Sequence, residues 1–127
     1  MVIAKQIATY LQAQGIGTIG TDLFYGYLPD KTGLPLVCVL DTGGMKPDIY
    51  LPTTHPTFQV FVRGATFVSG KEKIEAIRAL LHQSHNTTLV ANQTFFYYIY
   101  ALSEGGHIGR NASGQDEFSM NFEALTR

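Results

Sequence analysis

"TFQVFVRGATFVSGKEKIEAIRALL", residues 57–81, decides the fold, because its apolar residues change from the period of a strand to that of a helix. In the first half every second residue is apolar, which predicts a half-buried strand: Phe58, Val60 and Val62. In the second half the apolar residues recur at helical spacing, which predicts an amphipathic helix: Ile74, Ile77 and Leu81. A strand followed directly by such a helix indicates a helix layer packed on a sheet.

Local signals predict where the helices begin and end. Ser69 followed three residues later by Glu72 has the spacing of a capping box, so we expect this helix to begin there. An earlier helix is predicted near the N-terminus, where apolar residues recur every four positions up to Leu11 and Gly15 offers a left-handed stop. The N-terminal segment is therefore expected to be a helix of the domain and not a signal peptide.

Three more segments predict strands. Residues 34–40, "LPLVCVL", are continuously apolar, which is typical of a strand covered on both faces. Residues 116–125, "DEFSMNFEAL", alternate between apolar and polar side chains. Residues 94–102, "TFFYYIYAL", carry aromatic side chains on both faces, and strict alternation puts three on one side: Phe96, Tyr98 and Tyr100.

Stretches rich in glycine and proline separate these elements. Residues 41–56 and 103–115 are predicted to be long loops. The resulting order of helix, strands, helix and strands indicates an α+β fold in one domain over residues 1–127. We expect two helices on one face of a mainly antiparallel sheet of about four or five strands. The other, aromatic face would be left for water or another chain, or would be covered by a second layer of the same domain.

Composition excludes several functional classes. Nine basic residues oppose ten acidic ones, for a formal net charge of −1, so no sequence-specific nucleic-acid surface is expected. No segment approaches the roughly 20 apolar residues of a membrane span. The only cysteine, Cys38, cannot close an internal disulfide and is expected to be a small buried residue in a reducing compartment.

One motif suggests catalysis. Asp41-Thr42-Gly43 after an apolar run resembles the signature of aspartic proteases, and "IGR" at 108–110 resembles a segment of the small retroviral members. Such catalysis needs two carboxylates that share a proton, so a symmetric dimer would have to supply the second one. However, Gly44 and Met45 follow the triplet where that family has a small Ala or Ser.

Two weaker patterns have simpler explanations. Gly64 and Gly70 flank a strand-to-helix turn but are spaced too far apart for a phosphate loop, and Glu72 would repel phosphate. His82 and His85 could share a helix face, but zinc needs more ligands than these two. We therefore expect no cofactor, no metal site and no catalytic residue.

Several segments together resemble the bacteriophage minor capsid or tail-terminator (tail completion) proteins. The segments are "IATYLQAQGIGTIGTDLFYGYLPD" (7–30), "LDTGGMKPDIYLPTTHPTFQVFVRG" (40–64) and "IGRNASGQDEFSMNFE" (108–123). They occur in the family's order and cover most of the chain. In this family the Asp41 triplet would be a shaped turn, in which the carboxylate accepts backbone N–H bonds and the glycines adopt special conformations.

The resemblance implies a non-enzymatic virion protein assembled in the cytoplasm of a bacterial host. Such proteins form a ring, usually of six copies, that caps the tail tube, ends tail growth and offers a surface for head joining. The implied partners are copies of itself, the tail tube protein and head–tail connector proteins, around an opening that would admit DNA. A head–tail connector or head-closure neck protein is the alternative function, and a retroviral-like dimeric protease using Asp41 is a more distant one.

Loop position and composition suggest which residues meet a neighbouring subunit or the tube. The expected interface residues are Asp41, Gly43, Gly44, Tyr50, Arg63, Tyr98, Tyr100 and Arg110.

Overall fold

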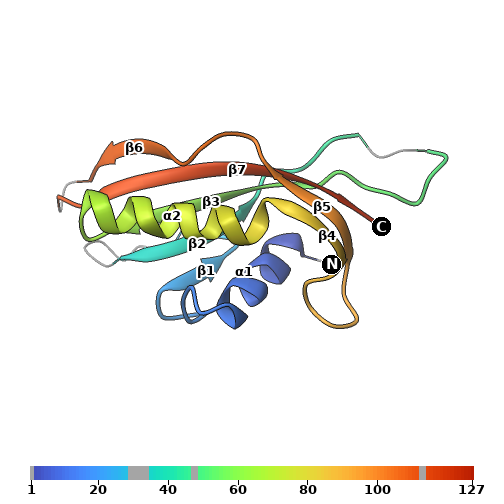
Figure 1. Ribbon diagram of the computed structural model, residues 1–127, viewed down its shortest axis with the longest axis horizontal. Coiled ribbons are helices and arrows are strands. Elements are labelled where there is room, and N and C mark those ends of the chain that lie inside the picture. Colours follow the sequence, from blue (N-terminus) through green and yellow to red (C-terminus); the bar gives the residue numbers. More distant parts are fainter. Residues whose placement is uncertain (1, 29–34, 47–48, 112–113) are drawn as a thin grey trace.

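The computed structural model describes residues 2–28, 35–46, 49–111 and 114–127. These residues form two helices and one seven-stranded sheet, which confirms the α+β class (Figure 1). The elements in chain order are α1 (Ile3–Ala13), β1 (Leu23–Tyr25), β2 (Leu36–Asp41), β3 (Thr57–Gly64), α2 (Phe67–Leu81), β4 (Gln83–Thr88), β5 (Phe95–Ala101), β6 (Gly106–Arg110) and β7 (Asp116–Thr126).

The sheet has the strand order β1-β2-β3-β7-β5-β4, and β6 also pairs with β7. All pairs are antiparallel except β1 with β2. The long strand β7 pairs with β3 along one side, while its other side is shared by β6 near Asp116 and β5 near Thr126. This arrangement makes β3 and β7 the centre of the fold.

The prediction of four or five strands was wrong, because the described residues already form seven. The additional strands carry little apolar signal: β4 has the sequence "QSHNTT", and β6, "GHIGR", lies inside the predicted loop 103–115. Both strands are held mainly by backbone pairing with a more apolar neighbour, which periodicity of side chains cannot reveal.

Both helices cover the same face of the sheet, as predicted. The apolar stripes of α1 and α2 share one continuous core with the inward side chains of β2, β3, β5 and β7. The rings of Phe58 and Phe122 stack at 5.1 Å within this core. Neither described helix is long and apolar enough to cross a bilayer.

The two faces of β5 differ from the prediction. A bulge between Phe96 and Tyr98 adds one residue to β5 relative to β7. Phe96 and Ile99 are therefore fully buried in the core, whereas Tyr98 and Tyr100 lie on the face away from the helices. Strict alternation had put Phe96 on the side of the two tyrosines, and the bulge is the physical reason for this error.

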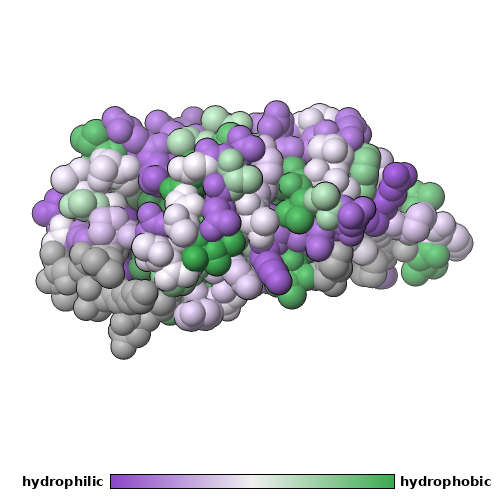
Figure 2. Space-filling view, turned by 90° about the horizontal axis from the view of Figure 1, so that it is seen from below, coloured by the Kyte–Doolittle hydropathy of each residue, from purple (hydrophilic) through white to green (hydrophobic). Residues whose placement is uncertain are grey.

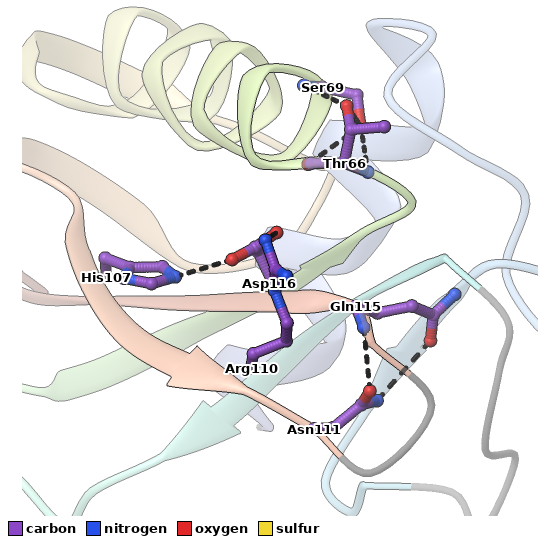
Figure 3. Close-up of polar contacts among 7 residues, drawn as sticks. All are labelled: Thr66, Ser69, His107, Arg110, Asn111, Gln115 and Asp116. Atoms are coloured by element: carbon purple, nitrogen blue, oxygen red, sulfur yellow. Dashed lines mark hydrogen bonds and ion pairs between the residues drawn. The ribbon is translucent and has the colours of Figure 1, made fainter.

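The start of α2 also differs from the prediction. Thr66, not Ser69, is the N-cap: the Ser69 N–H donates to Thr66 Oγ1 at 3.2 Å, and the Thr66 N–H donates to Ser69 Oγ at 3.1 Å (Figure 3). The Ser69 hydroxyl thus accepts the hydrogen bond from the N-cap backbone N–H that was expected to go to Glu72. Gly64 and Gly70 are in backbone contact, since a Cβ on Gly64 would lie 2.5 Å from the Cα of Gly70. These two glycines permit close packing of helix on strand.

Candidate functional site

A long arm leaves the sheet between β2 and β3 and projects beyond the ends of the strands (Figure 1). We define the arm by its described residues, 42–46 and 49–56. At its base the Thr42 N–H donates to Thr57 O at 3.1 Å, and further out the Met45 N–H donates to His55 O at 2.8 Å. The two limbs of the predicted loop are therefore paired near the sheet.

The returning limb of the arm is joined to the end of β7. Thr54 and Thr126 exchange two backbone hydrogen bonds, at 2.9 and 3.0 Å, and their hydroxyls lie 2.6 Å apart. The Ala124 N–H donates to Pro56 O at 2.9 Å. The arm thus continues the β3–β7 ladder, which fixes the direction in which it leaves the domain.

The Asp-Thr-Gly-Gly segment forms the root of the arm. Gly43 and Gly44 have φ values of +98° and +103°, which side chains rarely tolerate. A Cβ on Gly44 would also lie 2.8 Å from His55 O, so glycine lets the two limbs approach each other. Asp41 Oδ1 accepts the Ala4 N–H at 3.1 Å. The carboxylate thus supplies the cap that Val2, the N-cap residue of α1, lacks.

The arm carries apolar side chains that face solvent. Met45 is 51% exposed, Ile49 82%, Tyr50 88% and Leu51 59%. Figure 2 shows apolar atoms at the right-hand end of the molecule, where the arm lies. Of these residues only Tyr50 had been predicted at an interface. The signal for the others was an apolar tripeptide, Ile49 to Leu51, inside a segment rich in turn residues.

A second candidate surface lies on the sheet face away from the helices. The rings of Tyr98 and Tyr100 lie 4.5 Å apart on β5, and the Tyr100 ring lies 5.8 Å from that of His82. Partial burial raises the pKa of the Tyr98 hydroxyl above its ordinary value, and the nearby charges of Glu123 and Tyr100 raise it further. The aromatic face expected from the sequence therefore holds Tyr98 and Tyr100, whereas Phe96, which was expected beside them, lies in the core.

Toward β1 the same sheet face holds a small apolar cluster. It comprises Phe24, Leu36 and Cys38, with Leu40 and Phe61 at its edge. The Cys38 thiol is fully buried and donates to Tyr27 O at 3.0 Å. Burial raises the pKa of this thiol from 9.0 to about 11, which makes the thiolate rare at neutral pH.

Arg63, another predicted interface residue, interacts within its own subunit. Its side chain is only 8% exposed, and its Nε lies 3.2 Å from Glu117 Oε2 on β7. The guanidinium also lies over the Phe61 ring, 5.9 Å from its centroid. Its expected contact with a neighbouring subunit stays a prediction.

Arg110 belongs to a polar cluster at the turn between β6 and β7 (Figure 3). The buried Asp116 carboxylate interacts with His107 Nε2 at 2.9 Å and with Arg110 Nη2 at 3.6 Å. Beside it, the Gln115 N–H donates to Asn111 Oδ1 at 2.9 Å. These contacts close the hairpin, while the Arg110 side chain stays 66% exposed.

A groove lies at the other end of β2 and β3 from the arm. It has a volume of about 240 Å³, with apolar walls from Ile16, Pro35, Val37, Val62 and Ala65. Asp22, Arg63, Ser69 and Lys73 supply the polar side chains of its lining. The Lys73 ammonium donates to Ile16 O at 3.1 Å, and the Asp22 carboxylate accepts the Thr18 N–H at 2.7 Å. Sequence reasoning missed this groove, because its walls come from four separated segments.

The predicted interface residues thus do not form one site. Asp41, Gly43, Gly44 and Tyr50 belong to the arm or its root, and Tyr98 and Tyr100 lie together on β5. Arg63 is part of the groove lining, and Arg110 lies at the end of β6. In the described part of the chain, no three His, Cys, Asp or Glu residues are placed to hold a metal ion. The two histidines considered as ligands instead meet the backbone: His82 Nδ1 accepts the Ala101 N–H, and His85 Nε2 contacts Leu81 O.

Comparisons with known proteins place this fold. A chain in a solved structure, "Virion of native gene transfer agent (GTA) particle", superimposes with a TM-score of 0.66 at 16% sequence identity, covering 98% of this chain and 93% of that chain. No curated protein matches the sequence. The family described as "Bacteriophage tail terminator protein" matches residues 10–126. The chain therefore belongs to the bacteriophage tail terminator proteins, which are structural proteins of the virion and not enzymes.

Proposed function

We propose that copies of this chain form a ring, most simply of six, that caps the phage tail tube, ends its growth and provides the surface for head joining. The observation that carries the proposal is the family match, which spans residues 10–126. The similarity in fold to a chain of a virion particle agrees with it.

The physical basis of capping is a ring with two unlike faces. One face would bind the last ring of the tail tube, and the other would lack the surface on which tube subunits polymerise. Within the ring each subunit needs two different complementary surfaces, because a head-to-tail contact joins unlike patches. The arm, the β5 tyrosines and the groove are separate surfaces, which suits such an arrangement.

The Asp41 geometry supports a structural purpose for the triplet. Its carboxylate bonds to the Ala4 N–H at 3.1 Å, where it meets the positive end of the α1 dipole. The adjacent glycines shape the start of the arm. Each residue of the motif that resembled a protease signature thus has a structural explanation within one subunit.

The test is electron microscopy of phage assembled without this chain. We expect tails longer than those of the parent phage, without attached heads, and normal tails once the chain is supplied in trans. Tails of normal length that lack heads would overturn tail capping and favour the head–tail connector function. Mass measurement of the complex released from tails would give the number of copies in the ring.

A further inference from the structure

We propose that the arm of each subunit docks, through Ile49, Tyr50 and Leu51, into the groove of the neighbouring subunit. The proposal rests on the proposed ring, and it names the contact that would build it. The occupant of the groove is therefore a second copy of this chain.

The positions of arm and groove give the first argument. The arm begins where β2 ends and β3 starts, near Asp41 and Thr57, whereas the groove is lined by Val37 at the start of β2 and Val62 near the end of β3. At about 3.3 Å per residue, six-residue β2 separates them by roughly 20 Å. The arm projects away from the sheet (Figure 1), and at this separation from the lining residues it cannot fill its own groove.

The shape and chemistry of the two surfaces give the second argument. A groove of about 240 Å³ lies below the roughly 300–1,000 Å³ of small-molecule sites, but has room for a few side chains. Its apolar walls suit Ile49 and Leu51, which are 82% and 59% exposed in the isolated subunit. The polar groups of its lining suit Tyr50, whose ring ends in a hydroxyl.

The rigidity of the arm's base gives the third argument. The backbone bonds between Thr54 and Thr126, and between Met45 and His55, hold the lower part of the arm in line with the sheet. An arm fixed in direction loses less conformational freedom on docking than a free loop would. Contacts of an arm with the opposite end of the next copy repeat head to tail, and close into a ring if the rotation permits.

Cross-linking in assembled tails tests this contact. Ile49→Cys and Ala65→Cys place thiols on the arm and on the groove wall, at positions that are both exposed. Tails carrying the double variant are treated with a short bis-maleimide and separated on a denaturing gel. The unmodified chain is a clean background, because its only thiol, Cys38, is buried.

We expect the double variant to give a ladder of covalent multimers and each single variant to give monomers. Monomers alone from the double variant, in tails that contain the chain, would overturn the proposal. Dimers from Ile49→Cys alone would also overturn it, because they would show arm meeting arm. If tails grow overlong without the chain yet no ladder forms, this inference fails while the proposed function stands.

A second measurement uses substitutions that should block docking. Ile49→Ser with Leu51→Ser removes apolar surface from the arm, and Ala65→Trp fills the groove. Each should lower the amount of chain retained on tails by about tenfold or more. The matched control is Val68→Ser, an apolar residue that is 63% exposed and belongs to neither surface. Equal retention of all variants, with unchanged circular dichroism, would contradict the proposal.

Discussion

The Asp41 carboxylate at the end of β2 accepts the Ala4 N–H in the first turn of α1 at 3.1 Å, across 37 residues of sequence. The bond joins the helix layer to the sheet at the point where the arm departs. It also places a negative charge at the positive end of the helix dipole. An acid that a motif search assigns to catalysis is here part of the connection between α1 and the sheet.

Replacement of Asp41 should therefore change stability. We expect Asp41→Ala to lower the free energy of unfolding by about 1 kcal/mol, the usual effect of losing a helix cap. Asp41→Asn keeps a side-chain acceptor and should cost less than half as much. Urea denaturation of the purified variants measures both. An Asn variant as unstable as the Ala variant would indicate that the charge, and not the hydrogen bond, holds α1.

The contact between Gly64 and Gly70 predicts a strong effect of a single methyl group. A Cβ on Gly64 would lie 2.5 Å from both the Cα and N of Gly70. These are backbone atoms, so no side-chain rotation can relieve the clash. We expect Gly64→Ala to destabilise the protein by about 2–3 kcal/mol, as overpacking does in cores. Thermal unfolding followed by circular dichroism provides the measurement.

Gly106→Ala is the matched control, because the nearest atom to its Cβ would be Ser119 O at an ordinary 3.7 Å. We expect this variant to stay within about 0.5 kcal/mol of the unmodified protein. A Gly64→Ala variant as stable as the control would mean that α2 can move away from β3 at little cost.

The buried Cys38 thiol predicts how stability depends on pH. Its pKa is about 11 in the folded protein and 9.0 when unfolded, so below pH 9 both states keep the proton and the stabilisation is complete. Between pH 9 and 11 only the unfolded chain loses its proton, and the folded state loses stability. Above the folded pKa this contribution has gone.

Cys38→Ala removes this titration. We expect the free energy of unfolding, measured with urea, to fall less steeply between pH 9 and 11 in the variant than in the unmodified protein. Tyr98 also titrates above its ordinary value, but it is present in both proteins and cancels in the comparison. Parallel curves would contradict the assignment of this pH dependence to Cys38.

The sequence predicted the elements in which apolar side chains recur at the regular spacing of a strand or a helix. Residues of β3 and β7 alternate and α2 has an apolar stripe, so their type and buried faces were predictable. Strands β4 and β6 are held by pairing with β5 and β7, a property of the partner that their own residues do not encode. The bulge near Tyr98 is likewise a property of the β5–β7 pair.

The candidate surfaces follow the same distinction. The arm could be predicted as an excursion from Gly43, Gly44 and the prolines that follow, and its exposed Tyr50 from its position in that loop. The groove at the other end of β2 and β3 could not be predicted from the sequence. Its apolar walls come together only after the sheet and helices have packed, and they include Ile16, Val37, Val62 and Ala65. Residues such as Arg63 carry a charge that suggests a surface, yet the ion pair with Glu117 allows it to be buried.

That ion pair gives a prediction that separates folding from assembly. Arg63 Nε and Glu117 Oε2 lie 3.2 Å apart, with side chains only 8% and 20% exposed, so removing one partner leaves a charge largely shielded from water. We expect Arg63→Ala to cost about 3 kcal/mol in the unfolding of the isolated subunit. In a double-mutant cycle with Glu117→Ala, the two effects should be coupled by about 1–3 kcal/mol.

The control is Arg110→Ala, because that side chain is 66% exposed and lies 3.6 Å from Asp116, which also interacts with His107. Although Asp116 is buried, the Arg110 guanidinium is in water and Asp116 keeps its contact with His107, so we expect Arg110→Ala to cost about 1 kcal/mol or less. Suppose that the isolated Arg63→Ala subunit is as stable as the Arg110→Ala subunit, yet less of it is retained on tails. That result would show that the Arg63 guanidinium acts between subunits. If Arg63→Ala lowers both the free energy of unfolding of the free subunit and the amount retained on tails, Arg63 acts through the fold. The reason is that a subunit that unfolds more easily is also retained less.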